Sequence, residues 1–189
     1  GQIGPLFDEV LVSLSPGQEI DVGNIENGRP PASGRRKAGS GPGVGKAEKN
    51  DGPKLRIVRD EAPGLGPMAG VLVGLSAARN DACAVIAGDI PDVDAAFLRD
   101  LARAAAGTEI SVPVTPKGDF EPLFAVYKKS VVPRIERLLR MGERSLIPLF
   151  GLCRTARVPL GDPNRLRNLN TREDYRAYLK LIDGRKRGS

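Results

Sequence analysis

Two carboxylates and a glycine-rich loop are the residues of this chain whose types and spacing could support chemistry. Asp60 and Asp89 each end a short apolar run, and Gly64, Gly66 and Gly70 lie in the loop between them. In a doubly wound sheet, ligands bind beyond the carboxyl ends of the strands. Carboxylates there can hold Mg²⁺, which takes one or two of them and completes its shell with phosphate and water. Each Asp is equally explained as a residue that ends a strand and starts a turn.

Alternating strand and helix patterns predict the elements that position these residues. Leu55–Val58 is predicted as a strand, Val71–Arg79 as a helix, and Ala82–Ala87 as a parallel strand buried on both faces. The alternation indicates an α/β domain with a mostly parallel sheet and right-handed crossovers. Further strands are predicted at Glu9–Ser13, Ile110–Val114 and Ala156–Leu160, and further helices at Ala95–Ala106 (capped by Asp92 or Asp94), Val131–Leu139, Ser145–Phe150 and Thr171–Ile182.

Composition restricts the classes of function. The 189 residues suit a single domain, and the net charge of +6 favours an acidic partner, of which a phosphorylated small molecule is one example. The chain has no histidine, which excludes a His general base, and no Trp, which disfavours stacking on single-stranded nucleic acid. Its two cysteines, Cys83 and Cys153, fit a reducing cytoplasm. No apolar run approaches the length of a membrane span.

Residues 18–54 form a segment of unusual composition. It is rich in Gly, Pro, Lys and Arg, and has too few apolar residues to offset the entropy of ordering. We interpret it as a flexible insertion between two strands. Its stretch Gly41–Lys46 resembles a phosphate-binding loop, but Ser40 stands where that motif needs Gly and Ala47 where it needs Ser or Thr. We therefore reject that motif.

Four stretches in order resemble the molybdenum cofactor guanylyltransferases, which are MobA-like nucleotidyltransferases. They are Asp60–Gly70, Ala87–Pro91, Gly142–Leu146 and Asn168–Thr171. The resemblance implies a Rossmann-like three-layer nucleotidyltransferase fold. The family begins with a strand and a glycine-rich loop that wraps the nucleotide phosphates, whereas this sequence opens at residues 1–7, which resemble the end of the family's first helix. We expect that strand and loop to be absent, either because the sequence starts partway into the protein or because this version has lost them.

The resemblance also implies an activity and roles for individual residues. The chain would transfer GMP from GTP to the molybdenum–molybdopterin cofactor, giving the guanine dinucleotide cofactor and pyrophosphate, with molybdoenzymes or other cofactor-biosynthesis proteins as further partners. Asp89 would be the catalytic metal ligand for Mg²⁺ and, with the residues that follow, would contact the nucleotide. Asn168 and Asn170 would face the molybdopterin. The other nucleotide-binding residues implied are Ser13, Asp60, Gly64, Gly66, Pro67 and Gly70.

Simpler structural roles stay open for several of these residues. Ser13 could merely end a strand, Thr171 could cap the terminal helix with Asp174, and Lys128 and Lys129 could either meet phosphate or start a helix as exposed lysines. Two other functions also stay open. One is a cytidylyltransferase for the same cofactor, and the other is a non-catalytic relative that binds the cofactor.

Overall fold

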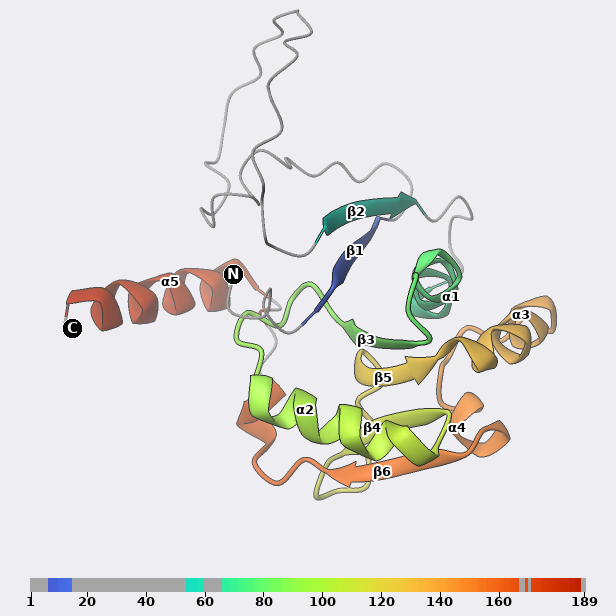
Figure 1. The fold of residues 1–189 in the computed structure, drawn as a ribbon. Coiled ribbons are helices and arrows are strands. Elements are labelled where there is room, and N and C mark those ends of the chain that lie inside the picture. The colour runs from blue at the N-terminus through green and yellow to red at the C-terminus, as the bar shows by residue number, and fades with distance from the viewer. Residues whose placement is uncertain (1–6, 15–53, 60–65, 167–168, 170, 188–189) are drawn as a thin grey trace, which may run out of the picture.

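The strands form two hydrogen-bonded sheets in the computed structural model, which describes residues 7–14, 54–59, 66–166, 169 and 171–187 (Figure 1). In the smaller sheet, β1 (Glu9–Leu14) and β2 (Lys54–Arg59) are parallel. The larger sheet has the order β3-β5-β4-β6. β5 runs antiparallel to β3 and β4, whereas β4 and β6 are parallel, so β3, β4 and β6 point the same way. The bounds in the larger sheet are β3 (Ala82–Ile86), β4 (Ile110–Val114), β5 (Phe124–Lys128) and β6 (Thr155–Pro159).

Helices connect and cover these strands. α1 begins at Pro67, a residue suited to a first helical position because it has no N–H to leave unpaired. α2 is capped by Asp94, whose Oδ1 accepts the backbone N–H groups of Ala96 and Phe97 at 3.0 Å. The helices are α1 (Pro67–Ala77), α2 (Ala95–Ala104), α3 (Val132–Arg140), α4 (Leu149–Leu152) and α5 (Arg172–Arg187), with short 3₁₀ turns at Ala105–Gly107, Lys129–Val131 and Pro163–Leu166.

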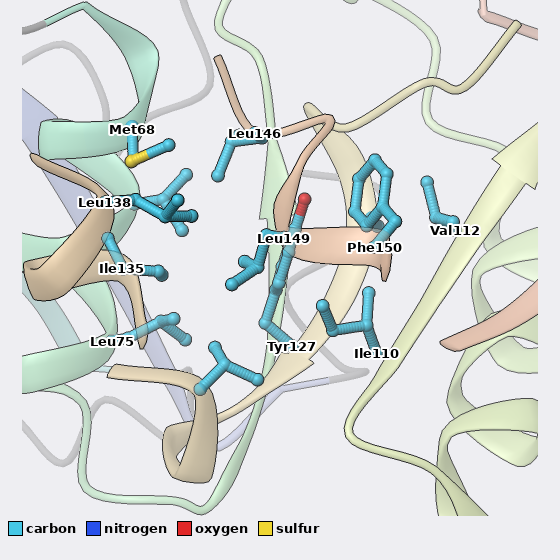
Figure 2. Close-up of a cluster of buried hydrophobic side chains, with 13 residues drawn as sticks. Met68, Leu75, Ile110, Val112, Tyr127, Ile135, Leu138, Leu146, Leu149 and Phe150 are labelled. Carbon is cyan, nitrogen blue, oxygen red and sulfur yellow. The ribbon is translucent and has the colours of Figure 1, made fainter. Parts of the chain in front are cut away.

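Helices pack on both faces of the larger sheet, which gives three layers. Alternate residues of β5 point to opposite faces, as strand geometry requires. Ala125 and Tyr127 face the core under α1, α3 and α4 (Figure 2), whereas Phe124 and Val126 face α2. Tyr127 is fully buried, and its hydroxyl donates to the carbonyl of Pro122 at 2.8 Å. The Rossmann-like α/β prediction is therefore confirmed, with β5 as the strand that runs against its neighbours.

The prediction for β3 is wrong in two respects, since the strand was expected to be parallel to its neighbour but pairs antiparallel with β5. Its apolar run was also expected to be buried on both faces, but Ala82 is exposed and the rest of the strand is half-buried. β3 stands at the end of the sheet order, and β5 is its ladder partner among the described strands. An apolar run indicates an apolar environment, but it does not determine how many strands pair. β2 and β3 lie in different sheets, so the strands that precede Asp60 and Asp89 in the sequence do not belong to one ladder.

Two predictions about organisation stay predictions. The proposed insertion at 18–54 lies outside the described residues, apart from Lys54, which begins β2. The division into a single domain also stays a prediction. Within the described part of the chain, no helix is both long and apolar enough to cross a membrane.

Candidate active site

Asp89 lies in the turn that follows β3. The backbone N–H of Ala87 donates to Leu123 at 2.8 Å, which continues the ladder just beyond β3, and the N–H of Ile90 closes the turn onto Ala87 at 3.3 Å. The Oδ1 atom of Asp89 is buried and has no hydrogen-bond partner in the described part of the chain. An Asp that serves only to form a turn uses its side chain to accept a backbone N–H. The Oδ1 atom of Asp89 accepts no such bond from the described residues.

Ser13 and Gly70 lie side by side. Ser13 is exposed near the carboxyl end of β1, and a Cβ atom on Gly70 would lie 3.5 Å from its Oγ. At the other end of α1, the guanidinium of Arg56 donates to the carbonyl of Ala77 at 3.1 Å and to the carboxylate of Glu9. The first turn of α1 therefore lies at the carboxyl end of β1, and its last turn at the amino end. This arrangement places Gly70 beside Ser13, the predicted nucleotide contact.

Gly66 brings two of the sequence motifs together. It precedes α1 with φ +71° and ψ −167°, a backbone conformation that is essentially restricted to glycine. A Cβ atom there would lie 3.7 Å from the carbonyl oxygen of Arg144, so the loop of residues 142–146 packs against the start of α1. No side chain caps α1, and its first turn has no acidic residue. These features favour the approach of an anion to the start of the helix.

Asp89 is joined to the C-terminal part of the chain. Its carbonyl oxygen accepts the backbone N–H of Leu169 at 2.8 Å. Leu169 stands in sequence between Asn168 and Asn170, the two predicted molybdopterin contacts. Those asparagines, together with Asp60 and Gly64, lie outside the described residues, so their roles stay predictions. Of the predicted site residues that are described, Ser13, Gly66, Pro67 and Gly70 gather at α1, and Asp89 lies at the end of β3.

The predicted cap of the terminal helix is confirmed. The hydroxyl of Thr171 accepts the N–H of Asp174 at 3.0 Å, and the carboxylate of Asp174 accepts the N–H of Thr171 at 2.9 Å. This reciprocal pair fixes where α5 starts. Lys128, the last residue of β5, and Lys129, which follows it, do not lie at the site. Lys128 pairs with Ala82 at the amino end of β3, and Lys129 donates to the carbonyl of Ala78 at 2.8 Å.

Two further carboxyl groups, those of Asp94 and Glu121, have shifted pKa values; the sequence singled out Asp94 only as a possible cap of α2 and did not single out Glu121. Asp94 is held by Arg165 at 2.9 Å, and the N–H of Phe97 together with this guanidinium lowers the pKa of its carboxyl. Glu121 precedes β5, and its N–H donates to Pro113 at 3.0 Å. Burial raises the pKa of the Glu121 carboxyl, and the charge of Asp119 adds to this effect. The sequence feature that could have drawn attention to Glu121 is its position directly before the Pro-Leu-Phe-Ala stretch.

The chemistry of the donors fits a magnesium ion held mainly by its substrates. Among the described residues, no group of three or more Cys, Asp or Glu side chains could hold a metal ion. Mg²⁺ does not need such a cage, because it is commonly bound through one or two carboxylates together with phosphates and water. Asp89, with its buried unpartnered oxygen, meets this requirement.

Comparisons with known proteins bear on the family and the fold of this chain. The MobA-like NTP transferase domain matches residues 35–155. A probable molybdenum cofactor guanylyltransferase of Carboxydothermus hydrogenoformans is 31% identical over 135 residues, which is 68% of this chain and 68% of that protein. The molybdopterin-guanine dinucleotide biosynthesis protein A of Archaeoglobus fulgidus has a TM-score of 0.55 at 23% identity, over 68% of each chain. A 2-C-methyl-D-erythritol 4-phosphate cytidylyltransferase from Thermus thermophilus has a TM-score of 0.59 at 18% identity, over 93% of this chain and 82% of that one.

These matches differ in what they support. The two solved structures share the fold with this chain. The domain match includes Gly66, Asp89 and Arg144, but it ends before Leu169 and does not reach back to Ser13. The chain spans 68% of the first curated relative and 60% of another of the same name.

Proposed function

Because this chain belongs to the MobA-like NTP transferase family, we propose that it transfers GMP from GTP to the molybdenum–molybdopterin cofactor. The products are the guanine dinucleotide cofactor and pyrophosphate. The observation that supports this most directly is the buried, unpartnered carboxylate oxygen of Asp89 at the carboxyl end of β3. Relatives at 31–33% identity carry the name molybdenum cofactor guanylyltransferase, which is why these substrates are chosen.

The reaction requires two anions to approach each other. An oxygen of the acceptor's phosphate attacks the α-phosphorus of GTP, and the bond from that phosphorus to the leaving pyrophosphate breaks. A site for this step must hold the phosphates in line and offset their repulsion. Bound Mg²⁺ supplies charge that stabilises the transferring phosphate and the leaving group. In our proposal Asp89 holds this ion through its carboxylate.

The remaining residues bind and orient the two substrates. Ser13 and Asp60 contact the guanosine. Gly64, together with Gly66, Pro67 and Gly70 at the start of α1, contacts the nucleotide, and the glycines let the backbone approach it closely. Support for these nucleotide contacts comes from the packing of Gly70 on Ser13 and of Gly66 on the loop of Arg144. Asn168 and Asn170 face the molybdopterin, supported by the bond between Leu169 and Asp89. A cytoplasmic location stays a prediction.

A cytidylyltransferase for the same cofactor is the second candidate. Ser13 is the described residue proposed to contact the base, and one exposed hydroxyl can hydrogen-bond to either base. The fold is also shared with a cytidylyltransferase and so does not decide between nucleotides. The choice between GTP and CTP therefore has to be measured.

Calorimetric titration of the chain with Mg²⁺–GTP and with Mg²⁺–CTP tests the proposed nucleotide. We expect micromolar binding of GTP and at least tenfold weaker binding of CTP. Stronger binding of CTP would replace the proposal by the cytidylyltransferase. Binding of the molybdopterin cofactor without either nucleotide would favour a non-catalytic relative.

A further inference from the structure

Glu121 stands at the same edge of the larger sheet as Asp89. β3 and β4 point the same way, because both run antiparallel to β5, so their carboxyl ends share one edge. Asp89 follows the end of β3. At the end of β4, Phe120 forms a bridge with Val114, and the N–H of Glu121 donates to the carbonyl of Pro113 at 3.0 Å.

Backbone bonds alone fix the position of Glu121. Its carbonyl accepts the N–H of Phe124 at 3.2 Å, which closes a turn at the start of β5. Two residues after Glu121, the carbonyl of Leu123 accepts the N–H of Ala87, which lies just beyond β3, at 2.8 Å. Residues 120–123 therefore run along the sheet edge from the end of β4 to the end of β3. The fold here does not depend on the side chain of Glu121.

The carboxylate of Glu121 lacks a complementary group in the described part of the chain. It is half-buried, and the described residues give it neither a hydrogen bond nor an ion pair. Burial raises the pKa of this carboxyl, and the nearby charge of Asp119 adds to the effect. An ionised carboxylate accepts hydrogen bonds and donates none, so a partner with N–H groups would stabilise it.

The proposed substrates carry one kind of group that suits this carboxylate. Their phosphates are repelled by it, whereas the 2-amino-4-oxopyrimidine ring that guanine and pterin share presents an N–H beside an amino group. Two carboxylate oxygens can accept both donors at once. In Figure 1, β1 lies on one side of β3, and β5 and β4 lie on the other. The proposed guanosine contacts are at β1 and α1, where Gly70 meets Ser13. The ring that reaches Glu121 is therefore the pterin.

We propose that Glu121 binds the pterin ring of the acceptor, with its carboxylate accepting the ring N–H and the amino group. Glu121 is a substrate-binding residue that holds neither Mg²⁺ nor guanosine. This inference rests on the proposed function for the identity of the acceptor. The position and burial of the carboxylate do not depend on that function.

The test compares Glu121→Gln with Asp119→Asn. Each variant replaces a carboxylate by an amide of similar shape in the same loop, and Asp119 is exposed. For Glu121→Gln we expect at least about a tenfold rise in the dissociation constant of the molybdenum–molybdopterin cofactor in calorimetry, because hydrogen bonds to a charged group are lost. The KM for the cofactor should rise in parallel. The dissociation constant of Mg²⁺–GTP and kcat should stay within twofold, and Asp119→Asn should change none of these values beyond twofold.

Thermal stability provides a readout that does not depend on binding. The amide of Gln is less costly to bury than an ionised carboxylate that the described residues leave unpartnered. Glu121→Gln should therefore keep or raise Tm in differential scanning calorimetry. A structural role for the carboxylate would lower Tm instead.

Different failures are distinguishable. If the parent chain binds the cofactor but transfers no GMP, the proposed function fails, while the binding comparison still decides the role of Glu121. A parent chain that does not bind the cofactor overturns both. An unchanged dissociation constant for the cofactor in Glu121→Gln overturns the inference. Weaker binding of GTP in place of the cofactor also overturns it, since the carboxylate would then contact guanine, as does a lower Tm with kcat and both KM values altered together.

Discussion

Replacing Asp89 by Ala should separate function from stability. The Oδ1 atom of Asp89 is buried and has no hydrogen-bond partner among the residues that the structure describes. A buried polar group left unsatisfied costs about 1–3 kcal/mol of folding free energy, and this substitution removes that cost. For a chain of this size, 1 kcal/mol changes Tm by about 2–4 °C. Because some packing is also lost, we take the lower end of the free-energy range, about 1 kcal/mol, and expect Tm to rise by about 2–4 °C.

The same substitution should nearly abolish transfer. A metal ion stabilises the transition-state charge by several kcal/mol, and each 1.36 kcal/mol corresponds to a factor of ten in rate. Loss of its protein carboxylate should therefore lower kcat/KM at least about 100-fold. Asp100→Ala is the matched control, since this carboxylate on α2 is 54% exposed and pairs only across the surface with Arg103.

The assays are differential scanning calorimetry and a transfer assay in Mg²⁺. Asp100→Ala should leave Tm within about 1 °C and activity unchanged. Our reasoning is refuted if Asp89→Ala keeps activity within a few-fold while Tm falls by about 2 °C or more. That result would mean that Asp89 only forms the turn after β3.

Three further predictions concern glycines of the site and acid stability. Gly66→Ala should lower Tm by several degrees, because Ala at φ +71° and ψ −167° costs about 1–3 kcal/mol; an unchanged Tm in calorimetry would contradict the strained backbone. Gly70→Ala should keep or raise Tm, since its Cβ would lie 3.5 Å from Ser13, an ordinary contact, but should weaken GTP binding about tenfold in a titration. Unchanged GTP affinity would exclude a nucleotide here. The N–H of Arg154 and an ion pair lower the pKa of Glu109 below its usual 4.5, so its stabilisation is present above that pH and is lost as pH falls through the lowered value. Glu109→Gln should be less stable at pH 7 and lose less on acidification in urea titrations from pH 7 to 3; an unaltered pH slope would contradict this assignment.

Local signals in the sequence were sufficient for most elements. β4 has the predicted bounds Ile110–Val114, because a short apolar run rich in β-branched residues is a strong strand signal. The cap formed by Thr171 and Asp174 was also predicted, since both partners lie within one turn of helix. For α2 the sequence left two caps open. The structure assigns the cap to Asp94, while Asp92 accepts from Tyr178.

Contacts between distant segments could not be predicted in the same way. The helix predicted to start at Val71 begins at Pro67, because Gly66 adopts a left-handed conformation that lets the helix start directly after it. The pairing of β3 with β5 depends on which strands meet in space, and an apolar run does not encode this.

The candidate site also combines local signals with contacts between distant segments. Asp89 could be chosen from its position after a strand, but the burial of its Oδ1 atom depends on neighbours far away in the chain. The packing of Gly66 against Arg144 joins residues that are distant in sequence, as does the bond between Asp89 and Leu169. Resemblance indicated which motifs belong together, and the structure adds the contacts that join them.

The most direct test of the central claim is a transfer assay with GTP labelled at the α-phosphate. The chain, Mg²⁺ and the molybdenum–molybdopterin cofactor are mixed, and label is followed into the dinucleotide cofactor, with labelled CTP in parallel. Our account predicts that label from GTP appears in the cofactor together with pyrophosphate, and that label from CTP does not. Transfer from CTP alone, or no transfer from either nucleotide by a chain that binds the cofactor, would contradict it.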